Sequence, residues 1–162
     1  MTVRLMHADD AEAIAAIYNE GIRGRGATLR PDEVTAGDVA SWVDQIERHP
    51  VVVVVRDDEV VGWARAGKYS DFPPYAGVGE LAIYVRTDAR GTGVGRELVE
   101  GLAAAARESG HWKLTAKVFP GNQASLGLLT GCGWREVGLH LRHGRLDGAW
   151  LDVVLLELSL EG

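Results

Sequence analysis

Apolar residues recur along the chain with two different periods, and each change of period marks a new element. In the first half, runs rich in β-branched residues at 2–6 and 50–68 predict strands, and the second run is long enough for a hairpin around a polar turn. Between them, helical spacing predicts one helix that starts at Asp9, an acidic N-cap with a glutamate three residues later, and a second helix over 36–48.

The second half continues the alternation of strands and helices. Strands are predicted at 80–85, 112–119, 134–142 and 149–160, and helices at 96–110 and 122–133. Glycine- and proline-rich segments at 23–34 and 68–79 are predicted as loops. The full order, β-α-α-β-β-β-α-β-α-β-β, predicts one α/β domain with a mixed sheet over residues 1–162.

The composition is that of a soluble globular protein, with 46% hydrophobic and 25% charged residues among 162. A formal net charge of −6 supplies no overall field for nucleic acid, and the longest apolar run, at 51–55, is far too short to span a membrane. The N-terminus lacks the basic and then apolar pattern of a signal peptide. A single cysteine, Cys132, rules out an internal disulfide, so a cytoplasmic protein with no nucleic-acid or membrane partner is expected.

A glycine-rich stretch, VRTDARGTGVGREL at 85–98, lies between a predicted strand and a predicted helix. The N-terminus of a helix carries a partial positive charge and amide donors without intrahelical partners. Glycines let the backbone approach an anion closely, because they have no side chain in the way. The stretch therefore indicates a phosphate-binding loop.

Spacing excludes two familiar nucleotide-binding loops. A Walker loop needs Lys and then Ser or Thr at the start of the helix, where this chain has Arg96 and Glu97. A dinucleotide fingerprint needs its third glycine three residues after the second, but Gly91, Gly93 and Gly95 are spaced by two.

The pattern that remains is Arg/Gln-x-x-Gly-x-Gly, which Arg90, Gly93 and Gly95 match. It resembles the pyrophosphate loop of the GCN5-related N-acetyltransferase superfamily, which binds acetyl-coenzyme A. The strand LAIYV before the loop, the helix after it and a later helix opening with Asn122 match as well, so the resemblance covers nearly the whole chain. Within the superfamily, the strings IYNEGI, GELAIYV and WLD look most like the phosphinothricin, methionine sulfoximine and arsinothricin N-acetyltransferases.

The resemblance implies a set of site residues. Glu80 matches the family carboxylate that takes a proton from the acceptor amine, usually through water; a solvated carboxylate at the end of a strand is the alternative interpretation. Tyr75 and Trp150 are assigned to the acceptor substrate. The residues expected to contact the coenzyme are Ile83, Tyr84, Val85, Arg90, Gly91, Thr92, Gly93, Val94, Gly95, Arg96 and Asn122.

The chain also departs from the family at positions that bear on chemistry and substrate. Leu129 stands where the family usually has His or Tyr, which acts as a base or as an acid for the departing thiolate. Ser70 and Ala76 stand where resembling enzymes carry arginines that hold the carboxylate and phosphinate of the acceptor. The arginines that remain to replace them lie in the loop 23–34: Arg23, Arg25 and Arg30.

The other candidate residues indicate structural roles. His140 and His143 lie three apart in a predicted strand, so their side chains should point to opposite faces, and no metal site is expected. Cys132 lies at a helix end without a histidine beside it, which favours a packed free thiol.

These observations together favour an acetyl-CoA-dependent N-acetyltransferase that uses Glu80 as its base and a small amino-acid-like amine as acceptor. Two alternatives stay open: an acetyltransferase of a protein amine or a polyamine, which the net negative charge would suit, and a non-catalytic acyl-CoA sensor, which Leu129 leaves conceivable. The last predicted strand, 149–160, is apolar on both faces, so one face needs cover and a homodimer through the final hairpin is expected.

Overall fold

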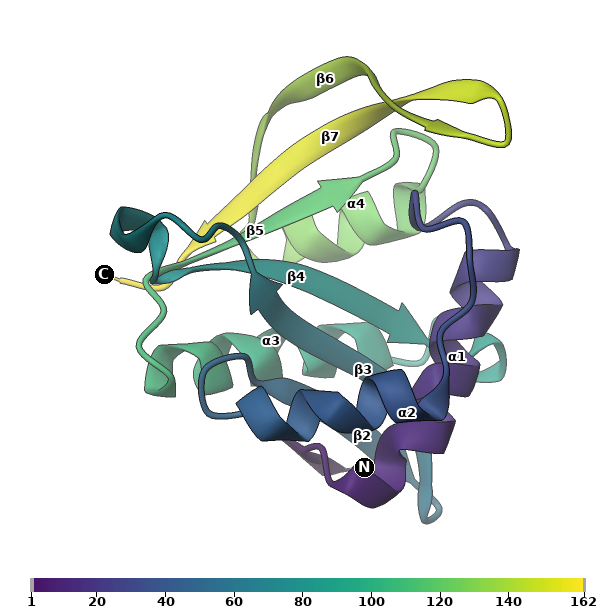
Figure 1. Ribbon diagram of the computed structural model, residues 1–162, viewed down its shortest axis with the longest axis vertical. Helices are drawn as coiled ribbons and strands as arrows, with labels where there is room; N and C mark the ends of the chain where they lie inside the picture. Colours follow the sequence, from purple (N-terminus) through teal and green to yellow (C-terminus); the bar gives the residue numbers. More distant parts are fainter. Residues whose placement is uncertain (1, 162) are drawn as a thin grey trace.

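One sheet, in the order β1-β2-β3-β4-β5-β7-β6, carries the fold of the computed structural model, which describes residues 2–161 (Figure 1). All neighbouring strands are antiparallel except β4 and β5, which run parallel. The strands are β1 (Thr2–Leu5), β2 (Val51–Arg56), β3 (Glu59–Lys68), β4 (Val78–Val85), β5 (Lys113–Val118), β6 (Arg135–Leu146) and β7 (Ala149–Ser159). The helices are α1 (Ala11–Arg23), α2 (Ala36–Ala40), α3 (Val94–Glu108) and α4 (Gln123–Gly131). The predicted class and order of elements are confirmed.

Helices α1 and α2 cover one face of the first half of the sheet (Figure 1). Ile14 and Ile17 of α1 lie one turn apart and pack, with Val39 of α2, against the fully buried Trp63 of β3. This spacing of buried residues is the helical period that the sequence pattern contains. The face of β3 and β4 beneath these helices therefore has an apolar floor.

Helices α3 and α4 cover the opposite face. Leu98 and Leu102 of α3 are fully buried and belong to the same apolar cluster as Leu114 of β5. A Cβ added to Gly62 of β3 would lie 2.9 Å from a methyl carbon of Leu98 and 2.9 Å from one of Val94, so glycine at this position lets α3 pack directly on the strand. Within residues 2–161, no helix has the length and apolar character needed to cross a membrane.

The second helix is shorter than the predicted 36–48. The Thr35 hydroxyl accepts a hydrogen bond from the backbone N–H of Asp38 at 3.0 Å and starts α2, which ends at Ala40. Ser41–Gln45 continue as a 3-10 helix. Both helix types place residues three apart on one face, so apolar spacing alone does not separate them.

The N-cap of α1 is Asp10 rather than the predicted Asp9, and its side chain makes no cap hydrogen bond to this helix. The Asp10 carboxylate accepts the backbone N–H of His7 at 2.7 Å and binds the guanidinium of Arg4 through both oxygens, at 2.7 and 3.0 Å. Burial by itself would raise the pKa of Asp10, but the hydrogen bonds from Arg4 and His7 outweigh it and leave that pKa lowered. This carboxylate ties β1 to α1.

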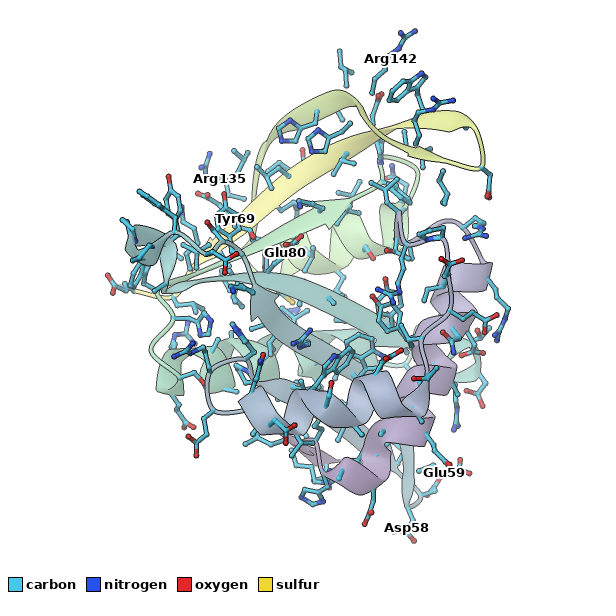
Figure 2. The ribbon with its side chains drawn as sticks, in the orientation of Figure 1. Asp58, Glu59, Tyr69, Glu80, Arg135 and Arg142 are labelled. Carbon is cyan, nitrogen blue, oxygen red and sulfur yellow. The ribbon has the colours of Figure 1, made fainter. Side chains whose placement is uncertain are left out.

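The prediction that His140 and His143 point apart is wrong. Their rings stack, with centroids 4.2 Å apart and planes 16° apart. The register between β6 and β7 shifts between His140 and Gly144, and Arg142 in this stretch has φ of +48°. The bulge interrupts the two-residue alternation of the strand and brings both rings together. Figure 2 labels Arg142 at the top of the view, at the outer edge of the sheet.

Candidate active site

The central feature of the site is a fork between β4 and β5. These parallel strands pair at only three positions, Val78 with Lys113, Gly79 with Leu114 and Glu80 with Thr115. Beyond Glu80, β4 stays with β3 while β5 stays with β7, so the two halves of the sheet diverge (Figure 1). Within residues 2–161, no strand pairs with the edge of β4 that follows Glu80 and faces the gap.

The unpaired edge of β4 presents specific backbone groups to the gap. The N–H of Arg86 donates to the carbonyl of Val61 on β3 at 2.8 Å. Alternate residues of a strand direct their N–H groups to the same side, so those of Ile83 and Val85 point into the gap. Tyr84 faces β3 with its backbone, as Arg86 does. The backbone groups of Tyr84 are therefore used by β3, whereas the N–H groups of Ile83 and Val85 face the gap, where a coenzyme could reach them.

The glycine loop forms the turn between β4 and α3. Gly91 and Gly93 have φ of +73° and +90°, a left-handed conformation that glycine adopts without strain. Gly93 is the N-cap of α3, which begins at Val94, and none of the described side chains caps this helix end. The guanidinium of Arg56 holds the loop from β2 by donating to the Thr92 hydroxyl at 2.7 Å and to its carbonyl at 2.8 Å.

The other predicted loop residues flank the same helix start. Nε of Arg90 donates to the carbonyl of Val85 at 3.3 Å, which ties the loop to the end of β4. A Cβ on Gly95 would lie 2.9 Å from a methyl of Leu128, so glycine there lets α4 approach α3. Arg96 is exposed and forms an ion pair along α3. The result is an exposed helix N-terminus with uncapped amides beside the open edge of β4, which suits an anion.

Helix α4 closes the far side of the fork. The Asn122 side chain caps it as predicted, accepting the N–H of Ser125 at 3.2 Å. Leu129, only 1% exposed, packs into the apolar cluster under α3 and α4 while still lining the fork. Burial raises the pKa of the Cys132 thiol at the end of this helix, in keeping with a packed thiol.

A cleft of about 570 Å³ occupies the fork. Its walls come from α1, residues 27–29, β3, β4, β5 and the beginning of α4. Glu80 lies at the apex, where the strands separate, and Figure 2 shows it near the middle of the molecule. Its side chain is 32% exposed, and Oε1 lies 3.1 Å from Nζ of Lys117 on β5.

Sequence reasoning misses two cations of this cleft. Lys117 reaches Glu80 because Thr115, two residues earlier on β5, is in register with Glu80. Arg65 of β3 lines the same cleft, with its guanidinium carbon 4.6 Å from the ring centroid of Trp42. Neither position carries a motif, and both depend on strand register that the sequence does not state.

The two predicted substrate residues lie apart from Glu80. Tyr75 is 48% exposed in a short 3-10 helix and contacts Phe72, with ring centroids 5.8 Å apart; it is absent from the cleft lining among residues 2–161. Trp150 is 53% exposed and lines a second depression of about 440 Å³, which shares Asn122 with the cleft. The guanidinium of Arg145 lies 5.0 Å from the Trp150 ring centroid.

The three arginines of the loop 23–34 have other partners. Arg23 pairs with Glu33 at 2.7 Å, and Arg25 pairs with Asp147 at 3.1 Å. Arg30 donates to a backbone carbonyl of its own loop and lies 6.0 Å from the ring centroid of a cleft tyrosine. Arg23 and Arg25 are thus already neutralised by carboxylates.

Comparison with known proteins agrees with this arrangement. A family model described as acetyltransferase (GNAT) family matches residues 13–134. The L-methionine sulfoximine/L-methionine sulfone acetyltransferase of Pseudomonas aeruginosa is 32% identical over 155 residues, which cover 94% of this chain and 90% of that protein. The phosphinothricin N-acetyltransferase of Alcaligenes faecalis is 36% identical over 165 residues, covering 98% and 82%.

A solved structure of an acetyltransferase from Salmonella typhimurium with its cofactor acetyl-CoA has a TM-score of 0.93 and 28% identity, covering 99% of this chain and 94% of that one. Sequence and structure thus agree over almost the full length of the chain. The protein belongs to the GNAT family of acetyltransferases and is an acyltransferase close to the phosphinothricin and methionine sulfoximine N-acetyltransferases.

Proposed function

We propose that the protein transfers the acetyl group of acetyl-CoA to the amine of a small amino acid of the methionine sulfoximine or phosphinothricin kind, with Glu80 as general base. The observation that carries this proposal is the Glu80 carboxylate at the apex of the β4–β5 fork, inside the cleft and 3.1 Å from Lys117. The named activities of the relatives from Pseudomonas and Alcaligenes support the choice of acceptor class.

Acetyl-CoA fits the open side of the fork. Its pyrophosphate would lie against the uncapped amides at the start of α3, in the loop that Arg56 holds through Thr92. Its pantetheine arm would follow the free edge of β4 and accept or donate hydrogen bonds to the backbone of Ile83 and Val85. The acetyl group would then lie near Glu80.

The chemistry needs a group that accepts a proton from the ammonium and a hydrogen-bond donor that stabilises the oxyanion. An ammonium must lose a proton to Glu80, directly or through water, before its nitrogen attacks the thioester carbonyl. A backbone N–H on β4 stabilises the negative oxygen of the tetrahedral intermediate. The C–S bond then breaks, the thiolate leaves, and the attacking nitrogen gives its second proton to water, so that a neutral amide remains. Because a thiol has a pKa of about 8.5, the thiolate departs without a dedicated acid, so Leu129 is compatible with turnover.

An acceptor panel separates this proposal from the alternatives. Incubation with acetyl-CoA and methionine sulfone, phosphinothricin, spermidine or a peptide amine should release free CoA thiol fastest with the two amino acids. Release with spermidine or peptide alone would favour a polyamine or protein acceptor. Tight acetyl-CoA binding without thiol release from any member would favour a non-catalytic sensor.

The coenzyme loop is tested by Gly93→Val. Valine at φ of +90° strains the turn and fills the approach to the amides, so acetyl-CoA affinity should fall tenfold or more, about 1.4 kcal/mol. Gly110, at the other end of α3, has φ of +91° and equally open surroundings, so Gly110→Val is the matched control for strain. Calorimetry should detect the loss only in Gly93→Val; equal affinities for both folded variants would contradict the loop assignment.

The role of Glu80 is tested by Glu80→Gln. Removing a general base should lower kcat/KM by about 10²–10⁴-fold at neutral pH while leaving acetyl-CoA affinity unchanged. The deficit should shrink at high pH, where more of the acceptor amine is already neutral. Lys117→Met removes the other partner of the same ion pair and should lower kcat/KM far less than Glu80→Gln does. Equal losses in both variants, constant with pH, would make Glu80 a structural residue.

We also propose that the β6–β7 hairpin forms a homodimer interface. β6 lies at the edge of the sheet and exposes apolar side chains, with Val137 42%, Leu139 52% and Leu141 71% exposed. Light scattering at micromolar concentration should give twice the 17.4 kDa mass of the chain. Leu141→Glu should halve the measured mass, whereas Leu5→Glu on the opposite edge strand should not; a wild-type monomer would refute the interface.

A further inference from the structure

Arg65 extends from β3 into the cleft beside the proposed base. It is in register with Ala82, and the side chain of Glu80, two residues along β4, lies on the same face. Gly67 is directly opposite Glu80 and has no side chain, and Nη1 of Arg65 lies 3.8 Å from where its Cβ would be. The guanidinium therefore extends along β3 toward Gly67, the residue opposite Glu80, and one of its faces lies against Trp42.

The Arg65 guanidinium has no anionic partner in the described chain. Its Nε is buried without a hydrogen-bond acceptor, and no carboxylate of residues 2–161 forms an ion pair with it. The two lysines of the cleft differ, because Lys117 pairs with Glu80 and Lys68 pairs with Asp71. Arg65 is thus the cation of the cleft whose charge the protein leaves uncompensated.

Apart from Glu80, which pairs with Lys117, the described residues that line the cleft bring no carboxylate near Arg65. Burial lowers the pKa of His49, another cleft residue, and the positive charge of Arg65 lowers it further, so His49 is neutral at neutral pH. The neighbouring side chains are aromatic, Trp42 and Tyr18. A partly buried, unpaired cation lowers the stability of the free protein, so its presence indicates a ligand rather than a structural role.

We propose that Arg65 binds the α-carboxylate of the acceptor amino acid and is thereby a specificity-determining residue of the enzyme. The proposal rests on the proposed function, since it names the group that an amino-acid acceptor presents next to its amine. The proposal also explains how the chain can bind a carboxylate although Ser70 and Ala76 replace the arginines of similar enzymes. The cation that binds the carboxylate comes from β3, in the floor of the cleft, instead of from the loop before β4.

The spacing suits an α-amino acid. Arg65 and Glu80 are diagonal neighbours on adjacent strands, which places their backbones about 7–8 Å apart. An α-amino acid carries its amine and its carboxylate on one carbon, so the amine can face Glu80 through a water while the carboxylate meets the guanidinium. With Trp42 against one face, the N–H edge of the guanidinium remains for the two carboxylate oxygens. A polyamine offers no such group and would be repelled.

The test compares two acceptors and three enzymes. The acceptors are L-methionine sulfone and its α-carboxamide; the enzymes are the wild type, Arg65→Met, and Arg48→Met as a control at an exposed arginine outside the cleft lining. Arg65→Met should lower kcat/KM for the sulfone about 10- to 100-fold, mainly by raising KM, because it removes a hydrogen bond between charged groups. For the carboxamide, Arg65→Met and the wild type should be equal, and Arg48→Met should match the wild type on both.

Two further measurements do not depend on turnover. Calorimetry with free CoA present, where no transfer can occur, should detect sulfone binding to the wild type and its loss in Arg65→Met. The melting temperature of Arg65→Met should equal or exceed that of the wild type, which separates lost binding from lost folding. Equal sulfone binding and kinetics in both enzymes would overturn the role of Arg65 and leave the acetyltransferase intact.

Two further outcomes show which anion of the acceptor Arg65 binds and whether the proposed function fails independently of that binding. Phosphinothricin carries a second anion, so a loss confined to phosphinothricin and absent with methionine sulfone would overturn the assignment to the α-carboxylate. A wild type that binds the sulfone beside CoA but never transfers acetyl would overturn the proposed function. In that case the calorimetric loss in Arg65→Met would still support the carboxylate site.

Discussion

The separation of β4 from β5 is the constraint on which the rest of the structure depends. The two halves of the sheet share only the three pairs that end at Glu80 and Thr115. The backbone groups on the far edge of β4 are therefore left available for a ligand that lies along the strand. The same divergence creates the cleft and leaves Glu80 at its apex.

Charge at the apex follows from strand register. Lys117 reaches Glu80 from β5, so that pair is close to neutral as a unit, whereas Arg65 on β3 remains without a counter-charge. The cleft therefore has a positive excess within a chain whose net charge is −6. The overall charge of the chain, which would suit a cationic acceptor, is a poor guide to the site, because the local field near the reacting atoms decides which acceptor binds.

Local signals in the sequence were sufficient for the order of elements, the glycine loop and the Asn122 cap, since each depends on residues adjacent in the chain. Lys117 and Arg65 could not be found in this way, because their positions depend on which residues of β3, β4 and β5 face one another. The free amide of Ile83 required the same knowledge. The stacking of the two hairpin histidines depends on a register shift between His140 and Gly144, and the glycines at 138 and 144 do not by themselves specify where that shift falls.

The proposed base and the aliphatic residue at the family's His or Tyr position lie on opposite faces of β4. Glu80 lies on the face of α1 and α2, while Leu129 belongs to the apolar cluster of α3 and α4 on the other face. A side chain that is 1% exposed and purely aliphatic can neither donate nor relay a proton, so the thiolate must leave as an anion. In the proposed reaction, the rate of its departure then depends on the acidity of the thiol itself, and Glu80 is the carboxylate of the described cleft lining that can take a proton from the amine.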